Sequence, residues 1–178
     1  MRRGEVLGLT WDNVNLNSGE INVERQLQRV NGKYEFVPPK TVRSKRKISM
    51  LNYTIPILKD IRKKQMEYKL LLGPEYNEFN LVYCKATGEP YDPYYISRNF
   101  LRQMTGIATE LNIPQIRFHD LRHTHATLLL SQNVHPKIVS ERLGHSSISI
   151  TLDTYSHVLP DMQKEAAEKL NDLMTQSM

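Results

Sequence analysis

The stretch that most constrains the fold is residues 117–155, RFHDLRHTHATLLLSQNVHPKIVSERLGHSSISITLDTY. His119 and Arg122 are three residues apart, so they share one face of a helix. Apolar residues continue the helical spacing behind them, at Ala126, Leu129 and Leu130. Gly144 then ends a short helix as a left-handed cap, and His145 follows it directly. We therefore expect a cluster of short helices joined by tight turns.

Polar side chains that suit phosphate chemistry gather in this cluster. Ser146 can cap the next helix, and that helix carries Tyr155. Two imidazoles, a guanidinium and a phenol then come within reach of one another: His119, His145, Arg122 and Tyr155. Arginine offers a phosphate a planar fork of donors, and a phenol can act as a nucleophile that forms a covalent intermediate. The combination predicts phosphodiester chemistry.

Length and composition narrow the class of protein. A chain of 178 residues with 39% hydrophobic and 24% charged residues is typical of one globular domain. The sequence has no apolar run of membrane-spanning length and no signal-peptide pattern. Its single cysteine, Cys84, is consistent with a reducing cytoplasm, where we expect the protein to act. A net charge of +5 suits a polyanionic partner, although many basic proteins bind no nucleic acid.

Several motifs together resemble the tyrosine recombinase (phage integrase) family. HDLRHTHAT, then LGHSS, then a tyrosine ten residues after that histidine are typical of it. RRGEVLGLTWDNV is similar to the family's first-arginine motif, and PKTVRSKRKISM to its β-hairpin lysine segment. The likeness is strongest to integrases of prophages and conjugative transposons. It implies that residues 1–178 are a catalytic domain that lacks the N-terminal DNA-binding domain and the first catalytic-domain helices.

The expected fold is α+β, mainly α-helical with a small antiparallel three-stranded sheet near the N-terminus, the tyrosine recombinase catalytic-domain fold. Residues 2–10 read as a helix, and residues 20–28, 33–38 and 46–50 read as the strands, with Asn31-Gly32 as a hairpin turn. Residues 161–174 read as an amphipathic helix, within a C-terminal segment that covers residues 161–178. In the family, that segment often docks on a neighbouring subunit. Docking of the segment on its own domain is the alternative.

The resemblance implies six catalytic residues: Arg2, Lys40, His119, Arg122, His145 and Tyr155. Arg2 is preferred to Arg3 because Glu5 lies three residues beyond Arg2 and can hold its guanidinium. Tyr155 would be the nucleophile and His119 the base, and the adjacent arginines should favour the phenolate. Lys40 would protonate the departing 5′ oxygen, with Lys45 as the rival position.

Residues 40–47, KTVRSKRK, carry five positive charges and no acid. Such a turn can lie along a DNA backbone, although a solvated surface run is the commoner fate. The predicted DNA contacts are Arg43, Lys45, Arg46 and Lys47.

The histidines also allow a metal interpretation. His119 and His123 are four residues apart, a spacing that zinc sites use, but no acidic partner follows them. We expect His123 and His125 to be packed, hydrogen-bonded helix residues. We expect no metal and no cofactor, because two arginines and His145 can stabilise the charge of a phosphoryl transition state.

The family resemblance therefore predicts site-specific recombination that integrates or excises a mobile element through a 3′-phosphotyrosyl intermediate. The partners are double-stranded DNA attachment sites, other recombinase subunits that form a tetramer on DNA, and an accessory directionality factor. Without DNA, we expect a monomer. Two alternatives remain: a type IB topoisomerase and a non-catalytic DNA-binding module.

Overall fold

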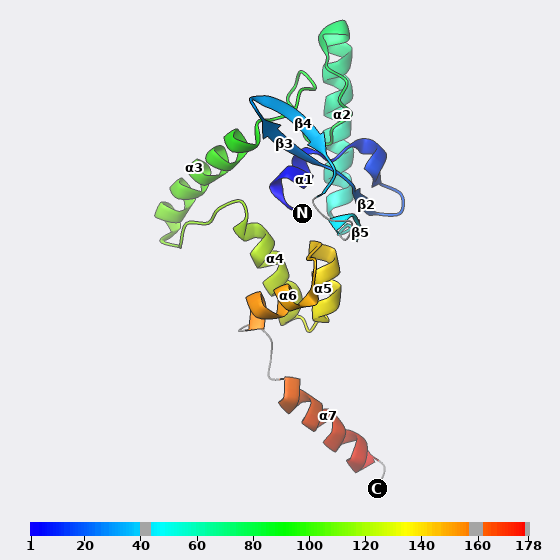
Figure 1. Cartoon of the computed structure of the whole chain (residues 1–178), viewed down its shortest axis with the longest axis vertical. Coiled ribbons are helices and arrows are strands. Elements are labelled where there is room, and N and C mark those ends of the chain that lie inside the picture. Colours follow the sequence, from blue (N-terminus) through cyan, green and yellow to red (C-terminus); the bar gives the residue numbers. More distant parts are fainter. Residues whose placement is uncertain (40–43, 157–161, 177–178) are drawn as a thin grey trace.

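The computed structural model of this chain describes residues 1–39, 44–156 and 162–176. Figure 1 shows a mainly helical protein with a small β region near the N-terminus, which confirms the predicted α+β class. The elements are α1 (Arg3–Leu7), the 3₁₀ turn η1 (Trp11–Asn13), β1 (Val14–Asn15), β2 (Glu20–Val23), β3 (Gln26–Val30), β4 (Lys33–Val37), β5 (Arg46–Ser49), α2 (Thr54–Leu72), the 3₁₀ turn η3 (Gly73–Glu75), α3 (Pro93–Leu111), α4 (Asp120–Ser131), α5 (Pro136–Leu143), α6 (Ile148–Tyr155) and α7 (Met162–Gln176).

The strands divide differently from the sequence prediction. The three-stranded antiparallel sheet has the order β1-β2-β5, and Ile21 lies opposite Ile48 in it. The predicted hairpin forms a separate two-stranded sheet of β3 and β4. The strand expected over residues 20–28 is interrupted at residues 24–25, so β5 pairs with β2 and not with β4.

Close packing of α1 explains the interruption. A Cβ on Gly8 would lie 2.8 Å from the backbone nitrogen of Leu27, so the glycine lets the end of α1 touch β3 directly. The Nε of Arg25 donates to the Gly8 carbonyl at 2.9 Å and fixes the bend. Leu27 is buried as a result, with 2% of its surface exposed.

The β region has its own apolar core. Its buried members are Leu9, Trp11, Val14 and Val82. Leu58 and Ile61 pack on this core from α2, and the Trp11 indole donates to the Gln65 side chain at 2.7 Å. Met66, the next residue along α2, is exposed.

A second core lies among α4, α5 and α6. It contains Ala126, Leu130, Val139, Leu143 and Tyr155, all buried. Gly144 ends α5 with a φ of 70°, as its cap position predicted. The cap of α6 is Ser147 and not Ser146: the Ser147 hydroxyl accepts from the amide of Ser149 at 3.2 Å.

α7 lies apart from these cores in Figure 1. Leu170 and Met174 are exposed along it, so their apolar side chains face solvent in this chain. Among the helices that the structure describes, none has the length and apolar character needed to cross a bilayer.

Candidate active site

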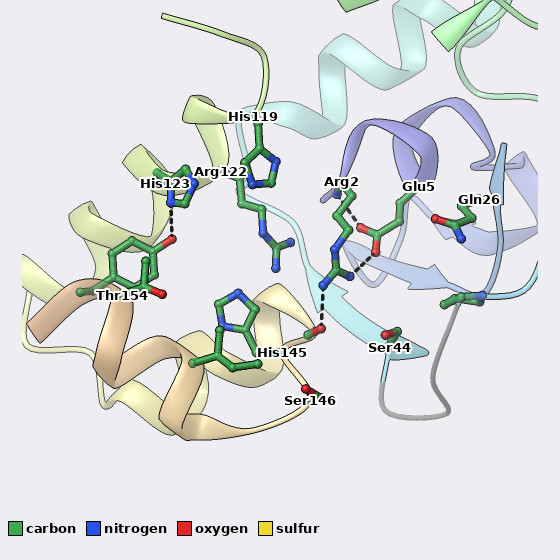
Figure 2. A pocket seen from close by; sticks show the side chains of 14 residues that line it. Arg2, Glu5, Gln26, Ser44, His119, Arg122, His123, His145, Ser146 and Thr154 are labelled. Atoms are coloured by element: carbon green, nitrogen blue, oxygen red, sulfur yellow. Dashed lines mark hydrogen bonds and ion pairs between the residues drawn. The ribbon is translucent and has the colours of Figure 1, made fainter. Parts of the chain in front are cut away.

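A cavity of about 550 Å³ separates the β region from the α4–α6 cluster. Its lining includes every predicted catalytic residue that the structure describes: Arg2, His119, Arg122, His145 and Tyr155. Figure 2 shows their side chains, which come from chain segments far apart in the sequence. Lys40 and Arg43 lie outside the described residues.

The first arginine is held by the residue that the sequence suggested. Arg2 Nη1 donates to Glu5 Oε1 at 3.0 Å, and the Arg2 amide donates to Glu5 Oε2 at 2.6 Å. Arg2 Nη2 reaches across the cavity to the carbonyl of Gly144 at 3.2 Å (Figure 2). Arg3, the alternative, is exposed and pairs with Ser97 instead. This arrangement favours Arg2 as the arginine that faces the cavity.

Glu5 also binds Arg46, one of the predicted DNA contacts. Arg46 donates through Nη1 and Nη2 to the two oxygens of Glu5, at 3.0 and 2.8 Å. Its Nε donates to the Arg142 carbonyl at 2.9 Å, and the side chain is 6% exposed. The structure therefore argues against a surface phosphate contact for Arg46. A Cβ on Gly144 would lie 2.8 Å from Arg46 Nη1, so this pairing also requires glycine there.

Burial alone would raise the pKa of Glu5. The hydrogen bonds from Arg46 and from the Arg2 amide outweigh that effect and lower the pKa to about 2. Glu5 is therefore an anion at neutral pH, although only 2% of its surface is exposed. It neutralises much of the positive charge on this side of the cavity.

Arg122 is buried at the floor of the cavity, with 7% of its surface exposed. Its Nη2 donates to the Leu143 carbonyl at 2.6 Å. Its Nη1 is buried and has no hydrogen-bond partner among the described residues. Burial and the nearby Arg2 lower the pKa of Arg122 to about 10, so it remains a cation at neutral pH. A buried donor without a partner is costly, and an anion in the cavity would satisfy it.

His145 enters the cavity as a neutral imidazole. Burial, followed by the fields of Arg122 and Arg2, lowers its pKa to about 4. Its Nδ1 lies 2.8 Å from the Thr151 hydroxyl. In the tautomer in which that hydroxyl donates to Nδ1, the Nε2–H is left to donate to a bound oxygen.

Tyr155 makes a contact that the sequence interpretation missed. Its hydroxyl lies 2.9 Å from Nδ1 of His123. The sequence spacing could have indicated that His123 belongs to the site, because His119 and His123 are one helical turn apart and both line the cavity. His125, in contrast, is a packed helix residue as predicted: its Nε2 accepts from Arg142 Nε at 3.0 Å. Burial raises the pKa of Tyr155 and the field of Arg122 opposes it, so the expected stabilisation of phenolate does not prevail in this structure.

His119 is the predicted base, and Lys45 and Lys47 are the lysines of the basic turn that the structure describes. Burial, then His123 and Arg122, lower the pKa of His119, so it can accept a proton at neutral pH. Lys45 is exposed and, with Lys137, lines a second hollow that shares His145 with the main cavity. Lys47 is exposed and forms an ion pair with Glu20 at 3.3 Å.

Metal ligands do not gather in the described part of the chain. No group of three or more histidine, cysteine, aspartate or glutamate side chains there could hold an ion. Asp120 turns to Arg117, with its Oδ2 accepting from the Arg117 amide at 2.7 Å.

Comparisons with known proteins show the family to which this chain is similar. Residues 1–162 match the phage integrase family. A XerC-like tyrosine recombinase of Caldanaerobacter subterraneus subsp. tengcongensis is 37% identical, over 97% of this chain and 46% of the relative. The ICEBs1 integrase of Bacillus subtilis is 31% identical, over 98% of this chain and 46% of the relative. The chain thus spans about half the length of these curated relatives.

A solved structure has a similar fold. The Tn1549 transposon integrase in complex with transposon right end DNA superimposes with a TM-score of 0.78 and 26% identity, over 96% of this chain and 54% of that chain. The XerA recombinase, 21% identical, shares the fold with a TM-score of 0.61, over 99% of this chain and 53% of that one.

Proposed function

The chain belongs to the phage integrase family, and on that premise we propose that it performs site-specific DNA recombination by tyrosine-mediated strand cleavage and rejoining. The substrate is the double-stranded attachment site of a mobile element. The relatives support this choice, because they include integrases and transposases, and one related structure is a complex of an integrase with the DNA of its transposon end.

The observation that carries the proposal is the unpaired donor of Arg122. Nη1 is buried in a cavity that also holds Arg2, two imidazoles and a phenol, and it lacks a partner among the described residues. A phosphodiester placed there would accept from Arg122 and Arg2, and its developing charge would meet the Nε2–H of His145. Fixed donors of this kind stabilise a phosphoryl transition state without a metal ion.

The chemical steps follow from this placement. The Tyr155 oxygen attacks the phosphorus, which forms a 3′-phosphotyrosyl link and releases a 5′ hydroxyl. The link conserves the energy of the broken bond, so a 5′ hydroxyl of another strand can reverse the reaction and join the strands. We assign Lys40 as the general acid for the leaving oxygen, as the family resemblance implies. The phenol proton passes to an imidazole that lines the cavity, for which the resemblance alone implies His119.

Assembly on DNA is part of the proposal. Strand exchange needs several active subunits, and α7 offers an apolar stripe, with Leu170 and Met174 exposed, that a neighbouring subunit can cover. We propose that α7 docks in trans. Removing residues 162–178 should then abolish the tetramer on DNA in sedimentation analysis, while a monomer still binds one half-site.

Trapping the covalent intermediate tests the proposed function. Wild-type full-length protein should form an adduct on a nicked suicide substrate that survives denaturing electrophoresis. Tyr155→Phe should bind the same DNA in a mobility-shift assay and form no adduct. An undiminished adduct from Tyr155→Phe would assign the nucleophile to another residue.

A further inference from the structure

The residue best placed to take the proton of Tyr155 is not the one that the sequence interpretation chose. We propose that His123 accepts this proton as Tyr155 attacks the phosphorus, which makes His123 a further catalytic residue of this site. The inference rests on the proposed function, because it assumes that Tyr155 is the nucleophile. It assigns to His123 a role that the sequence interpretation gave to His119.

The hydrogen bond between the two side chains is direct. His123 Nδ1 and the Tyr155 hydroxyl are 2.9 Å apart, and their rings are tilted by 53° with centroids 5.8 Å apart. Both side chains come from packed helices, because α4 and α6 share a core in which Ala126 and Tyr155 are buried. This distance is within the reach that a general base requires.

The His119 ring contacts the ring of His123, which in turn contacts Tyr155. Its imidazole meets that of His123 edge to face, with centroids 4.9 Å apart and planes at 82°. Within the described residues, the hydrogen bond of the Tyr155 hydroxyl goes to His123, and none joins it to His119. His119 is therefore better placed to contact the phosphate or to tune His123 than to take the phenol proton directly.

The proton balance is simple. His123 must be the tautomer with hydrogen on Nε2, so that Nδ1 is free to accept. The proton moves from the Tyr155 oxygen to Nδ1, the oxygen forms the bond to phosphorus, and the bond from phosphorus to the 5′ oxygen breaks. A separate acid, Lys40 in the proposed function, protonates that 5′ oxygen. On rejoining, the incoming 5′ hydroxyl gives its proton to Lys40, which the first step left neutral, and its oxygen bonds to phosphorus. The bond from phosphorus to the Tyr155 oxygen breaks, and the proton on Nδ1 returns to that oxygen.

The groups around His123 decide whether it can carry the added charge. Arg122 and the neutral imidazoles of His119 and His145 lie on the cavity side, and the arginine opposes a second cation. Asp120 in the first turn of α4 favours one, because hydrogen bonds from the backbone and side chain of Arg117 lower its pKa and keep it ionised. The phosphate itself adds negative charge when DNA is bound.

Two substitutions separate proton transfer from simple positioning. His123→Asn keeps a short polar side chain that can hold the Tyr155 hydroxyl but cannot take its proton, whereas His123→Phe keeps the ring and removes both functions. His125→Asn is the matched control on the same helix, since His125 contacts Arg142 and not Tyr155. Thermal unfolding and DNA mobility shifts should be similar in all of these variants.

The readout is the single-turnover rate of adduct formation on a suicide substrate between pH 6 and 9. Both His123 variants should be slower by about 10²–10⁴-fold, the range for a lost general base. Their rates should climb with pH across this range, because solvent hydroxide replaces the acceptor. A substrate with sulfur at the bridging 5′ position should not rescue them, since sulfur eases departure and not attack. His125→Asn should match wild type.

Distinct results would overturn the inference. Near wild-type rates in His123→Asn would reduce His123 to a positioning residue, and rescue by the sulfur substrate would make it the general acid. Either result still requires a wild-type adduct that Tyr155→Phe lacks. The proposed function therefore survives the failure of this inference, whereas an adduct retained by Tyr155→Phe would end both.

Discussion

The two walls of the cavity differ in whether their positive charges are paired with an acidic side chain. The N-terminal wall includes Arg2 and Glu5, with Arg46 bound to Glu5, and the helical wall includes His119, Arg122, His123, His145 and Tyr155. In the N-terminal wall, one buried carboxylate binds both guanidinium groups. The helical wall contains no acid, and it leaves one buried donor of Arg122 without a partner among the described residues.

The pKa shifts follow this difference. In the N-terminal wall, paired hydrogen bonds lower the pKa of Glu5 to about 2 and stabilise its charged form. In the helical wall, burial and neighbouring cations lower the pKa of His145 to about 4 and that of Arg122 to about 10. The charges of the N-terminal wall are therefore balanced within the protein, and this wall holds the two halves of the domain together. In the helical wall, by contrast, the buried Nη1 of Arg122 gains a hydrogen-bond partner only when an anion is bound.

Breaking the N-terminal wall should have the largest effect. Glu5→Gln leaves Arg46 buried without its counter-charge, so we expect a loss of about 3–5 kcal/mol in the free energy of unfolding. Urea denaturation at pH 7 measures it. Glu20→Gln is the matched control, because Glu20 pairs with Lys47 at the surface, where the two side chains are 33% and 61% exposed, respectively. Loss of this ion pair should cost less than about 1 kcal/mol. Equal losses in the two variants would contradict the assigned role of Glu5.

The same pair gives the wild-type protein a pH dependence. Because the folded pKa of Glu5 is below its unfolded value of 4.5, its contribution to stability is present above pH 4.5. That contribution is lost as the pH falls towards about 2. Between these limits the unfolding free energy of wild type should fall more steeply than that of Glu5→Gln, and parallel curves would be inconsistent with the lowered pKa.

Substitutions in the helical wall should slow adduct formation and leave the free energy of unfolding nearly unchanged. Arg122→Lys keeps a positive charge but loses the fork that serves both Leu143 and the phosphate. We expect adduct formation to slow by about 10²–10³-fold, as for a lost transition-state donor. Arg117→Lys is the control, because that exposed side chain pairs with Asp120 outside the cavity. A rate loss of similar size in Arg117→Lys would show that the effect does not depend on a guanidinium inside the cavity.

Substitution of Lys45, a lysine of the basic turn that the structure describes, should have a smaller effect. Lys45 is exposed, so Lys45→Ala should weaken DNA binding modestly and reduce the salt dependence by about one phosphate contact. It should slow cleavage of a normal and of a 5′-sulfur substrate alike. Lys40→Ala, if Lys40 is the general acid, should be rescued by sulfur. Rescue of Lys45→Ala alone would move that role to Lys45.

Chelation should have no effect. The cations of the two walls are side chains, so EDTA should leave adduct formation by the wild-type protein unchanged. Cleavage that stops with EDTA and returns with a divalent ion would restore the histidine-metal interpretation. A nuclease that depends on Mg²⁺ serves as the positive control for chelation.

Sequence patterns predicted the parts of this structure that local spacing determines. Gly144 stops α5 as its position suggested, and Glu5 holds Arg2 because both residues lie on the same turn. The patterns failed where partners are distant in the chain. The burial of Arg46 depends on Glu5, 41 residues away, and nothing near Arg46 distinguishes it from the exposed lysines beside it.

His123 illustrates a second kind of limit. Its helical position was predictable from its spacing to His119, but its contact with Tyr155, 32 residues away, depends on how α4 and α6 pack. The division of the strand at residues 24–25 depends likewise on α1 pressing against β3. Spacing along the chain assigned the residues to faces, and only tertiary packing decided which of those faces meet.

The contact from Arg2 to Gly144 joins residues 142 positions apart and has a consequence for biosynthesis. A ribosome releases Arg2 well before Tyr155, so a growing chain that already contains Arg2 still lacks the nucleophile and the helical wall that orients it. Under the proposed mechanism, a stalled or truncated translation product can bind DNA through its basic turn but cannot cut it.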